Sequence, residues 1–293
     1  MQICSFTCYY FTNRKPSDLI RIWWCPTGPL AFLPIHAAGI YDDESRPPGS
    51  CVSDFVVSSY TPTVGVLLDK IKASSVKKPT SSKVLLVSQA SAPSGHQTPG
   101  TTQEIESVMK ILGADSCINL EGSAATVTRV KQEMGTCDWV HFACGAGQNV
   151  DDPLKSSMFL DDGRLELLDI MQLRIPQCKF AFLSACRTAA GDERLPDEVV
   201  HLTAAMLSAG CQGVVGTMLA MKDKHGALVA ESFYEYLTAE RRNGSDVGSP
   251  GKPQLDSSRA AYALHHAIQR LRKQIGDTEE GLLAWIPYVH FGL

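Results

Sequence analysis

The stretch Phe180-Ala-Phe-Leu-Ser-Ala-Cys-Arg-Thr-Ala-Ala-Gly191 decides the fold, because it joins a buried strand to a turn that carries a cysteine. The apolar run 180–183 is typical of a strand that is covered on both faces of its sheet. Cys186 follows this strand and precedes Arg187, and a positive charge beside an accessible thiol favours the thiolate. We therefore predict that Cys186 is a nucleophile; the alternative is a small apolar core residue.

Strands and helices alternate on both sides of this stretch. The apolar patterns predict strands at 83–87, 117–120, 139–143, 180–184 and 213–217, and helices at 105–112, 126–134, 198–209, 225–237 and 258–273. Residues 30–33 and 52–60 are expected to be extended, 167–173 to form a short helix, and Asp161-Asp-Gly163 to turn a β-hairpin. This alternation predicts an α/β fold: a three-layer α/β/α sandwich with a mainly parallel sheet.

Composition excludes several classes of protein. The chain has 293 residues, 44% of them apolar, and 27 basic against 31 acidic side chains, so no surface for nucleic acid or an anionic membrane is expected. The uncharged run 199–221 is broken by polar residues and glycines, which predicts a helix and a strand, not a membrane span. We expect one domain over residues 19–293, a flexible loop at 240–257, and an unassigned segment at 1–18.

The ten cysteines show no CxxC pair and no regular spacing. We therefore expect neither a zinc site nor a disulfide framework, and the cysteine usage favours a reducing, cytoplasmic location. No leader is expected at the start of the sequence. The acidic pairs 151–152 and 161–162 are interpreted as solvated turns, not metal ligands. A nucleotide-binding protein is a further alternative, but no motif such as GxGxxG follows a strand, which argues against it.

A second turn is expected to lie beside Cys186. Phe142-Ala-Cys-Gly-Ala-Gly-Gln148 follows the expected strand 139–143. In parallel α/β sheets, reactive groups gather where neighbouring strands end, so we expect the two turns to face each other.

Several motifs together resemble a known family. Leu183-Ser-Ala-Cys-Arg-Thr188 is similar to the cysteine motif of CHAT domains, which are relatives of caspases and separases, and Trp139-Val-His-Phe-Ala-Cys144 is similar to the approach to their His-Gly motif. Segments 24–39, 58–63, 192–202 and 285–290 resemble parts of fungal CHAT domains, so the resemblance covers nearly the whole chain from about Leu19. It implies a caspase-like fold.

The resemblance also implies roles at the site. The Cys186 thiolate would attack a peptide carbonyl, a histidine would transfer the proton, and the backbone N–H of the residue after that histidine would hold the oxyanion. This sequence has Gly145 where the family has its histidine, and the following N–H belongs to Ala146. The substrate pocket would include Ser184, Asp192 and Leu219, and Leu219 stands where such domains usually carry a Trp.

No other histidine is expected to take over. His141 lies about 13 Å from residue 145 along a strand, at roughly 3.3 Å per residue, and is interpreted as a satisfied core histidine. His36, His96, His201 and His225 lie on remote segments, which leaves residue 145 without a replacement base.

We therefore expect a degenerate cysteine peptidase that is kept for binding or scaffolding. The alternative is an active cysteine endopeptidase that uses an unexpected base. The partner would be a protein or peptide, and the resemblance implies a tetratricopeptide-repeat region in a longer parent protein.

Overall fold

The computed structural model describes most of the chain. The described residues are 19–41, 49–74, 82–91, 98–147, 149, 152–184, 186–187, 198–218, 223–243, 254–276 and 278–293. Asp192 and Leu219, predicted in the substrate pocket, lie outside them, and so does the side chain of Cys186.

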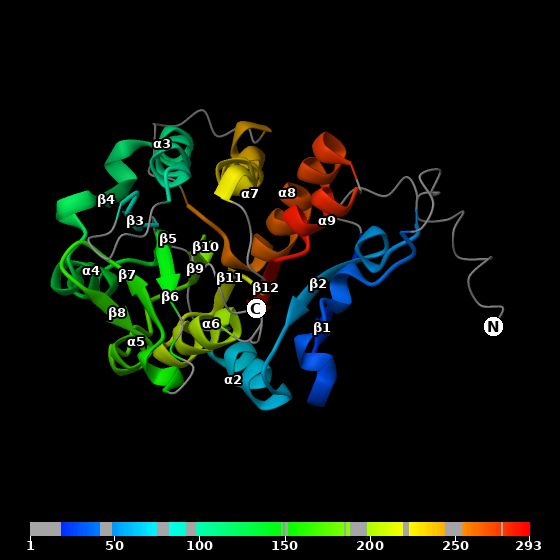
Figure 1. The fold of residues 1–293 in the computed structure, drawn as a ribbon, viewed down its shortest axis with the longest axis horizontal. Helices are drawn as coiled ribbons and strands as arrows, with labels where there is room; N and C mark the ends of the chain where they lie inside the picture. The colour runs from blue at the N-terminus through cyan, green and yellow to red at the C-terminus, as the bar shows by residue number, and fades with distance from the viewer. Residues whose placement is uncertain are drawn as a thin grey trace.

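An eight-stranded sheet crosses the molecule (Figure 1). Its strands lie in the order β1 (Ile20–Trp24), β2 (Val56–Tyr60), β12 (Tyr288–Gly292), β11 (Gly213–Thr217), β9 (Phe180–Leu183), β5 (Trp139–Ala143), β3 (Val84–Ser88) and β4 (Cys117–Glu121). β11 and β12 are antiparallel, and the other described neighbours in this sheet are parallel. The predicted mainly parallel sheet is confirmed.

Helices cover both faces of this sheet, as the sequence predicts. The helices are α2 (Val64–Ser74), α3 (Gly100–Leu112), α4 (Val127–Met134), α5 (Leu167–Gln172), α6 (Glu198–Ala209), α7 (Gly226–Asn243), α8 (Ala260–Ile275) and α9 (Glu279–Trp285). Apolar residues of α3, α7 and α8 pack on one face. Residues of α4, α5 and α6 pack on the other, which completes an α/β/α sandwich (Figure 1).

A smaller sheet branches from the main one. Its strands are β10 (Cys186–Arg187), β6 (Gly145–Gly147), β7 (Ser157–Phe159) and β8 (Arg164–Glu166), in that order. β7 and β8 form the predicted hairpin, and the Asp162 carboxylate in its turn accepts a hydrogen bond of 2.7 Å from the backbone N–H of Val127. The sequence predicted turns, and not strands, at β6 and β10.

Short 3-10 turns take the place of residues 30–32 and 52–54, which were expected to be extended. The 3-10 turns among the described residues are η2 (Gly28–Phe32), η3 (Ile35–Ala37), η4 (Val52–Asp54), η5 (Ala114–Ser116), η6 (Gly122–Ala124), η7 (Pro153–Lys155), η8 (Asp223–His225) and η9 (Ser257–Arg259). Pro29 in the first turn of η2 presets a helical φ, and the Asp54 carboxylate accepts from the backbone N–H of Cys51 and closes η4. Strand β2 therefore begins at Val56.

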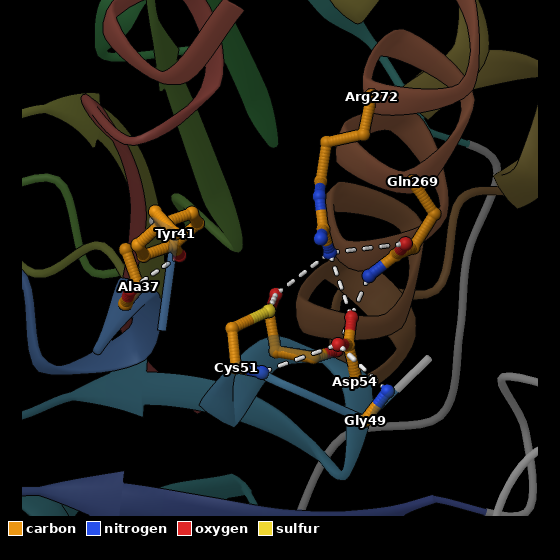
Figure 2. Close-up of polar contacts among 8 residues, drawn as sticks. Ala37, Tyr41, Gly49, Cys51, Asp54, Gln269 and Arg272 are labelled. Atoms are coloured by element: carbon orange, nitrogen blue, oxygen red, sulfur yellow. Dashed lines mark hydrogen bonds and ion pairs between the residues drawn. The ribbon is translucent and has the colours of Figure 1, made fainter. Parts of the chain in front are cut away.

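The η4 segment is fixed to α8 by polar contacts (Figure 2). The Arg272 guanidinium lies 2.8 Å from the Asp54 carboxylate and donates to the Ser53 hydroxyl at 3.0 Å. Gln269 donates to the Ser53 carbonyl at 3.1 Å. Burial raises the pKa of Asp54, but the hydrogen bond and charge of Arg272 outweigh it and leave that pKa lowered. This ion pair holds the segment before β2 against the helix layer.

The expected loop at 240–257 is partly wrong. Helix α7 continues to Asn243, and the described chain resumes at residue 254 just before η9. Residues 240–243 extend the helix because Glu240, Arg241 and Arg242 are good helix formers, although their polarity suggested a loop.

The expectation of no disulfide is also wrong, because Cys178 and Cys211 are bonded. Each lies two residues before a strand, and the first residues of those strands, Phe180 and Gly213, are partners in the parallel pairing of β9 and β11. That register brings the two cysteine Cα atoms to 4.6 Å from each other. Their separation of 33 residues gave no signal in the sequence.

Within the uncharged run 199–221, residues up to Ala209 belong to α6 and residues 213–217 form β11, as predicted, while residues 219–221 lie outside the described part. No helix in the described part of the chain has the length and apolar content that a membrane crossing requires.

Candidate functional site

The backbones of residues 145 and 186 lie opposite each other. In the main sheet Phe142 pairs with Leu183, an offset of 183 − 142 = 41 residues. Beyond that sheet, β6 and β10 are again parallel, and Gly145 pairs with Cys186 at the same offset, 186 − 145 = 41. The two segments that follow β5 and β9 therefore leave the sheet together and keep their register.

The ends of β5 and β9 explain why the two segments leave the sheet together. Neighbouring parallel strands end at the same edge of a sheet, so the turns after β5 and β9 meet there. The backbone N–H of Ser184 donates to the Phe142 carbonyl at 2.8 Å, which extends the ladder one step beyond β9. The pairing of Arg187 with Ala146 continues it.

Strand β6 is held on its other side by β7. Ala146 pairs with Met158, and Gly147 pairs with Ser157. A Cβ atom on Gly147 would lie 2.3 Å from Cζ of Phe159, so a larger residue at position 147 would require the Phe159 ring to move. Gly145 and Ala146 are both buried, and Ala146, the predicted oxyanion donor, has backbone neighbours on both sides.

His141 is a satisfied core histidine, as predicted. Its Nε2 lies 2.9 Å from Oε1 of Glu104 and its Nδ1 lies 3.2 Å from the Tyr234 hydroxyl. The ring is stacked on Phe182, with centroids 4.8 Å apart, in the layer that α3 and α7 cover. His141 is therefore not available as a base for Cys186.

Cys144, the thiol next to residue 145, is unsuited to nucleophilic attack. Complete burial, with the negative charge of Glu104 nearby, raises the pKa of Cys144 to about 12. A thiol with that pKa carries almost no thiolate near neutral pH.

Ser184, predicted in the substrate pocket, is buried, and its hydroxyl donates to Oε2 of Glu104 at 2.9 Å. Sequence reasoning missed Glu104, which shares a helical face with Val108 and Leu112. A charged residue on a buried face was the signal that could have revealed it, because such residues are almost never buried without partners.

One histidine from a remote segment comes to this edge of the sheet. Gly226, the first residue of α7, approaches so closely that a Cβ atom there would lie 3.3 Å from the Ser184 hydroxyl oxygen. His225 precedes it and is partly buried. Burial, and then the charge of Lys224, lower the pKa of His225, while Glu280 opposes them. His36, by contrast, binds the Tyr60 hydroxyl and the Ile286 carbonyl.

The fold places this chain in a class of α/β proteins, and solved structures with that fold include cysteine peptidases. The crystal structure of the Arg-specific cysteine proteinase gingipain R (RgpB) has a TM-score of 0.53 at 11% identity and matches 81% of this chain and 54% of that chain. The complex of Porphyromonas gingivalis RgpB pro- and mature domains has a TM-score of 0.54 at 9% identity, with 96% and 66% covered. The Saccharomyces cerevisiae separase–securin complex has a TM-score of 0.52 at 14% identity, with 84% and 15% covered.

These likenesses show a caspase-like fold, and the chain spans about half the length of the gingipain R chain and a small part of the separase chain. The family model of the CHAT domain matches residues 11–292. The chain therefore belongs to the CHAT domain family. No curated protein matches it.

Proposed function

We propose that this CHAT domain carries a degenerate peptidase site and binds a protein or peptide without cleaving it. One observation supports the proposal: the residue paired with Cys186 across β6 and β10 is Gly145, which has no side chain to accept a proton. His141, the nearest histidine in sequence, is already bound to Glu104 and Tyr234.

The missing base is expected to have a large effect on the rate of peptide cleavage. A positioned general base typically contributes about 10²- to 10⁴-fold to the rate, and an unassisted thiol has a pKa of about 8.5. Without a base, Cys186 would react with a peptide carbonyl only slowly.

Substituting Gly145→His tests this. We expect the variant to hydrolyse fluorogenic peptides about 10²- to 10⁴-fold faster than the natural chain, because an imidazole at this register position would face Cys186. Turnover is measured across a peptide library together with labelling by a thiol-reactive peptide probe.

Two controls define the outcome. Gly145→Ala adds a Cβ without an imidazole and is expected to leave turnover unchanged, and Gly145→His combined with Cys186→Ala is expected to abolish any gain. Prompt cleavage by the natural chain that is lost in Cys186→Ala would contradict the proposal.

The second candidate function is an active endopeptidase with Cys186 as nucleophile. The position of Gly226 against Ser184 favours it, because His225 then lies at the same edge of the sheet. If this candidate holds, His225→Ala removes the Cys186-dependent cleavage by the natural chain, and His266→Ala on α8 does not.

The proposed partner is a protein or a peptide. The separase structure contains securin, so that neighbour binds a protein partner. We propose a protein or peptide partner here too, with a tetratricopeptide-repeat region in a longer, fungal-type parent protein. We also propose one domain over residues 19–293, supported by a sheet that joins β1 to β12. We propose a cytoplasmic location as well, supported by five free cysteines among the described residues against the two in the Cys178–Cys211 bond.

A further inference from the structure

A buried carboxylate lies at the point where both site strands leave the main sheet. Glu104 on α3 is 1% exposed. Its Oε1 lies 2.9 Å from Nε2 of His141 on β5, and its Oε2 accepts a hydrogen bond of 2.9 Å from the Ser184 hydroxyl after β9. One side chain thus connects the two neighbouring strands that continue into β6 and β10.

The start of α7 encloses this carboxylate from another side. A Cβ atom on Gly226 would lie 2.9 Å from Oε2 of Glu104, so a glycine is needed for the close approach. The N-terminus of a helix carries partial positive charge, and α7 is 18 residues long, so the position suits a carboxylate. Tyr234, further along α7, binds His141, the histidine that Glu104 also binds.

The contacts of Ser184 connect this cluster with the pairing of Gly145 and Cys186. Its hydroxyl is held by Glu104, and its backbone N–H is held by the Phe142 carbonyl. Cys186 follows two residues later and pairs with Gly145. A change in the position of Ser184 would therefore act directly on that pairing.

We propose that Glu104 is a positioning residue, which keeps the backbones of Gly145 and Cys186 in register by holding Ser184. The inference concerns the site of the proposed function, but it does not depend on whether that site cleaves or only binds peptides. Loss of the Ser184 hydroxyl would leave a buried carboxylate oxygen without its donor, and a hydrogen bond to a charged group is among the stronger ones in proteins.

The test is Ser184→Ala, with Ser88→Ala as its matched control. Ser88 is the last residue of strand β3, which neighbours β5, and is also buried, but its hydroxyl has no hydrogen-bond partner among the described residues. Amide hydrogen exchange of the full chain is followed by mass spectrometry, with peptides that separate β6 and β10 from β1 and β2.

We expect Ser184→Ala to speed exchange at residues 145–147 and 186–187 by about 10- to 100-fold while exchange in β1 and β2 stays unchanged. Ser88→Ala is expected to change neither region. Equal exchange in the two variants, or a uniform increase over the whole chain, would overturn the inference, since a general loss of stability affects every strand.

Two further variants keep the test informative if Ser184→Ala folds poorly. Glu104→Gln keeps an oxygen for Ser184 and offers an amide to His141, so it is expected to retain most of the protection; Glu104→Ala is expected to lose it. Amide hydrogen exchange can be measured whether or not the chain cleaves peptides. If the natural chain proves to be an active peptidase, the proposed function fails while this inference stands or falls on its own result.

Discussion

The thiols that the structure describes differ in burial. Burial raises the pKa of Cys144 to about 12 and, with Cys137 nearby, that of Cys117 to about 11. Cys25, by contrast, is exposed. Labelling of Cys186 can therefore be measured in the folded protein without interference from its neighbour Cys144.

We predict that iodoacetamide at pH 8 labels Cys25 and leaves Cys144 unmodified in the folded chain. At that pH a thiol with a pKa of about 12 is ionised to about one part in 10⁴. Peptide mapping after timed labelling measures both sites, and labelling in urea serves as the control in which both react. Equal labelling of the two cysteines in the native chain would contradict the prediction.

At the same scale, the sequence predicted Cys186 and Gly145 as site residues but gave no sign of Glu104. The first two predictions rest on motifs that occur in a fixed order and on parallel strands that end at one edge of the sheet. Glu104 binds residues that lie 37 and 80 positions away, and no local pattern reports contacts of that range. Its helix was predicted from the apolar residues beside it.

Among the elements, the regular ones were predictable and the short ones were not. The apolar runs of β3, β5, β9 and β11 predicted strands, because strands buried on both faces need continuous apolar sequence. Strands β6 and β10 contain glycines, a cysteine and an arginine, and they form because the strands before them are already in register. The Cys178–Cys211 bond depends on the register of β9 and β11 in the same way.

We predict that reducing this disulfide lowers the free energy of unfolding by about 3–4 kcal/mol. The bond closes a loop of 33 residues, and a loop of that length restricts the unfolded chain by about this amount. Urea unfolding with and without a phosphine reductant gives the difference. In Cys178→Ala with Cys211→Ala the reductant should have no effect; an unchanged midpoint on reduction of the natural chain would contradict the prediction.

At the scale of the whole molecule, three of the buried histidines that the structure describes have lowered pKa values. His36, His265 and His290 line a cavity of about 30 Å³ between α8 and the sheet. Burial lowers the pKa of His36 and of His265 to about 4, and burial together with the charge of Arg21 lowers that of His290 well below its usual value. In the unfolded chain these histidines would titrate near pH 6.5.

We predict that the chain loses stability as the pH falls from 6.5 toward 4. Over this range the unfolded chain binds protons that the folded chain does not, so the stability present above pH 6.5 decreases, by about 2 kcal/mol for each of His36 and His265 at pH 5. Urea midpoints at pH 7, 6 and 5 measure the loss, and His265→Gln should make it smaller. Equal midpoints at pH 7 and pH 5 would contradict the prediction.

The place of β12 in the sheet has a consequence for synthesis on the ribosome. β12 separates β2 from β11, although it follows both in the sequence. A nascent chain can assemble β3, β4, β5, β9 and β11, but it cannot join β1 and β2 to them until residues 288–292 emerge. Until then the edges of β2 and β11 lack their central neighbour, and unpaired strand edges are the surfaces that chaperones must shield from aggregation.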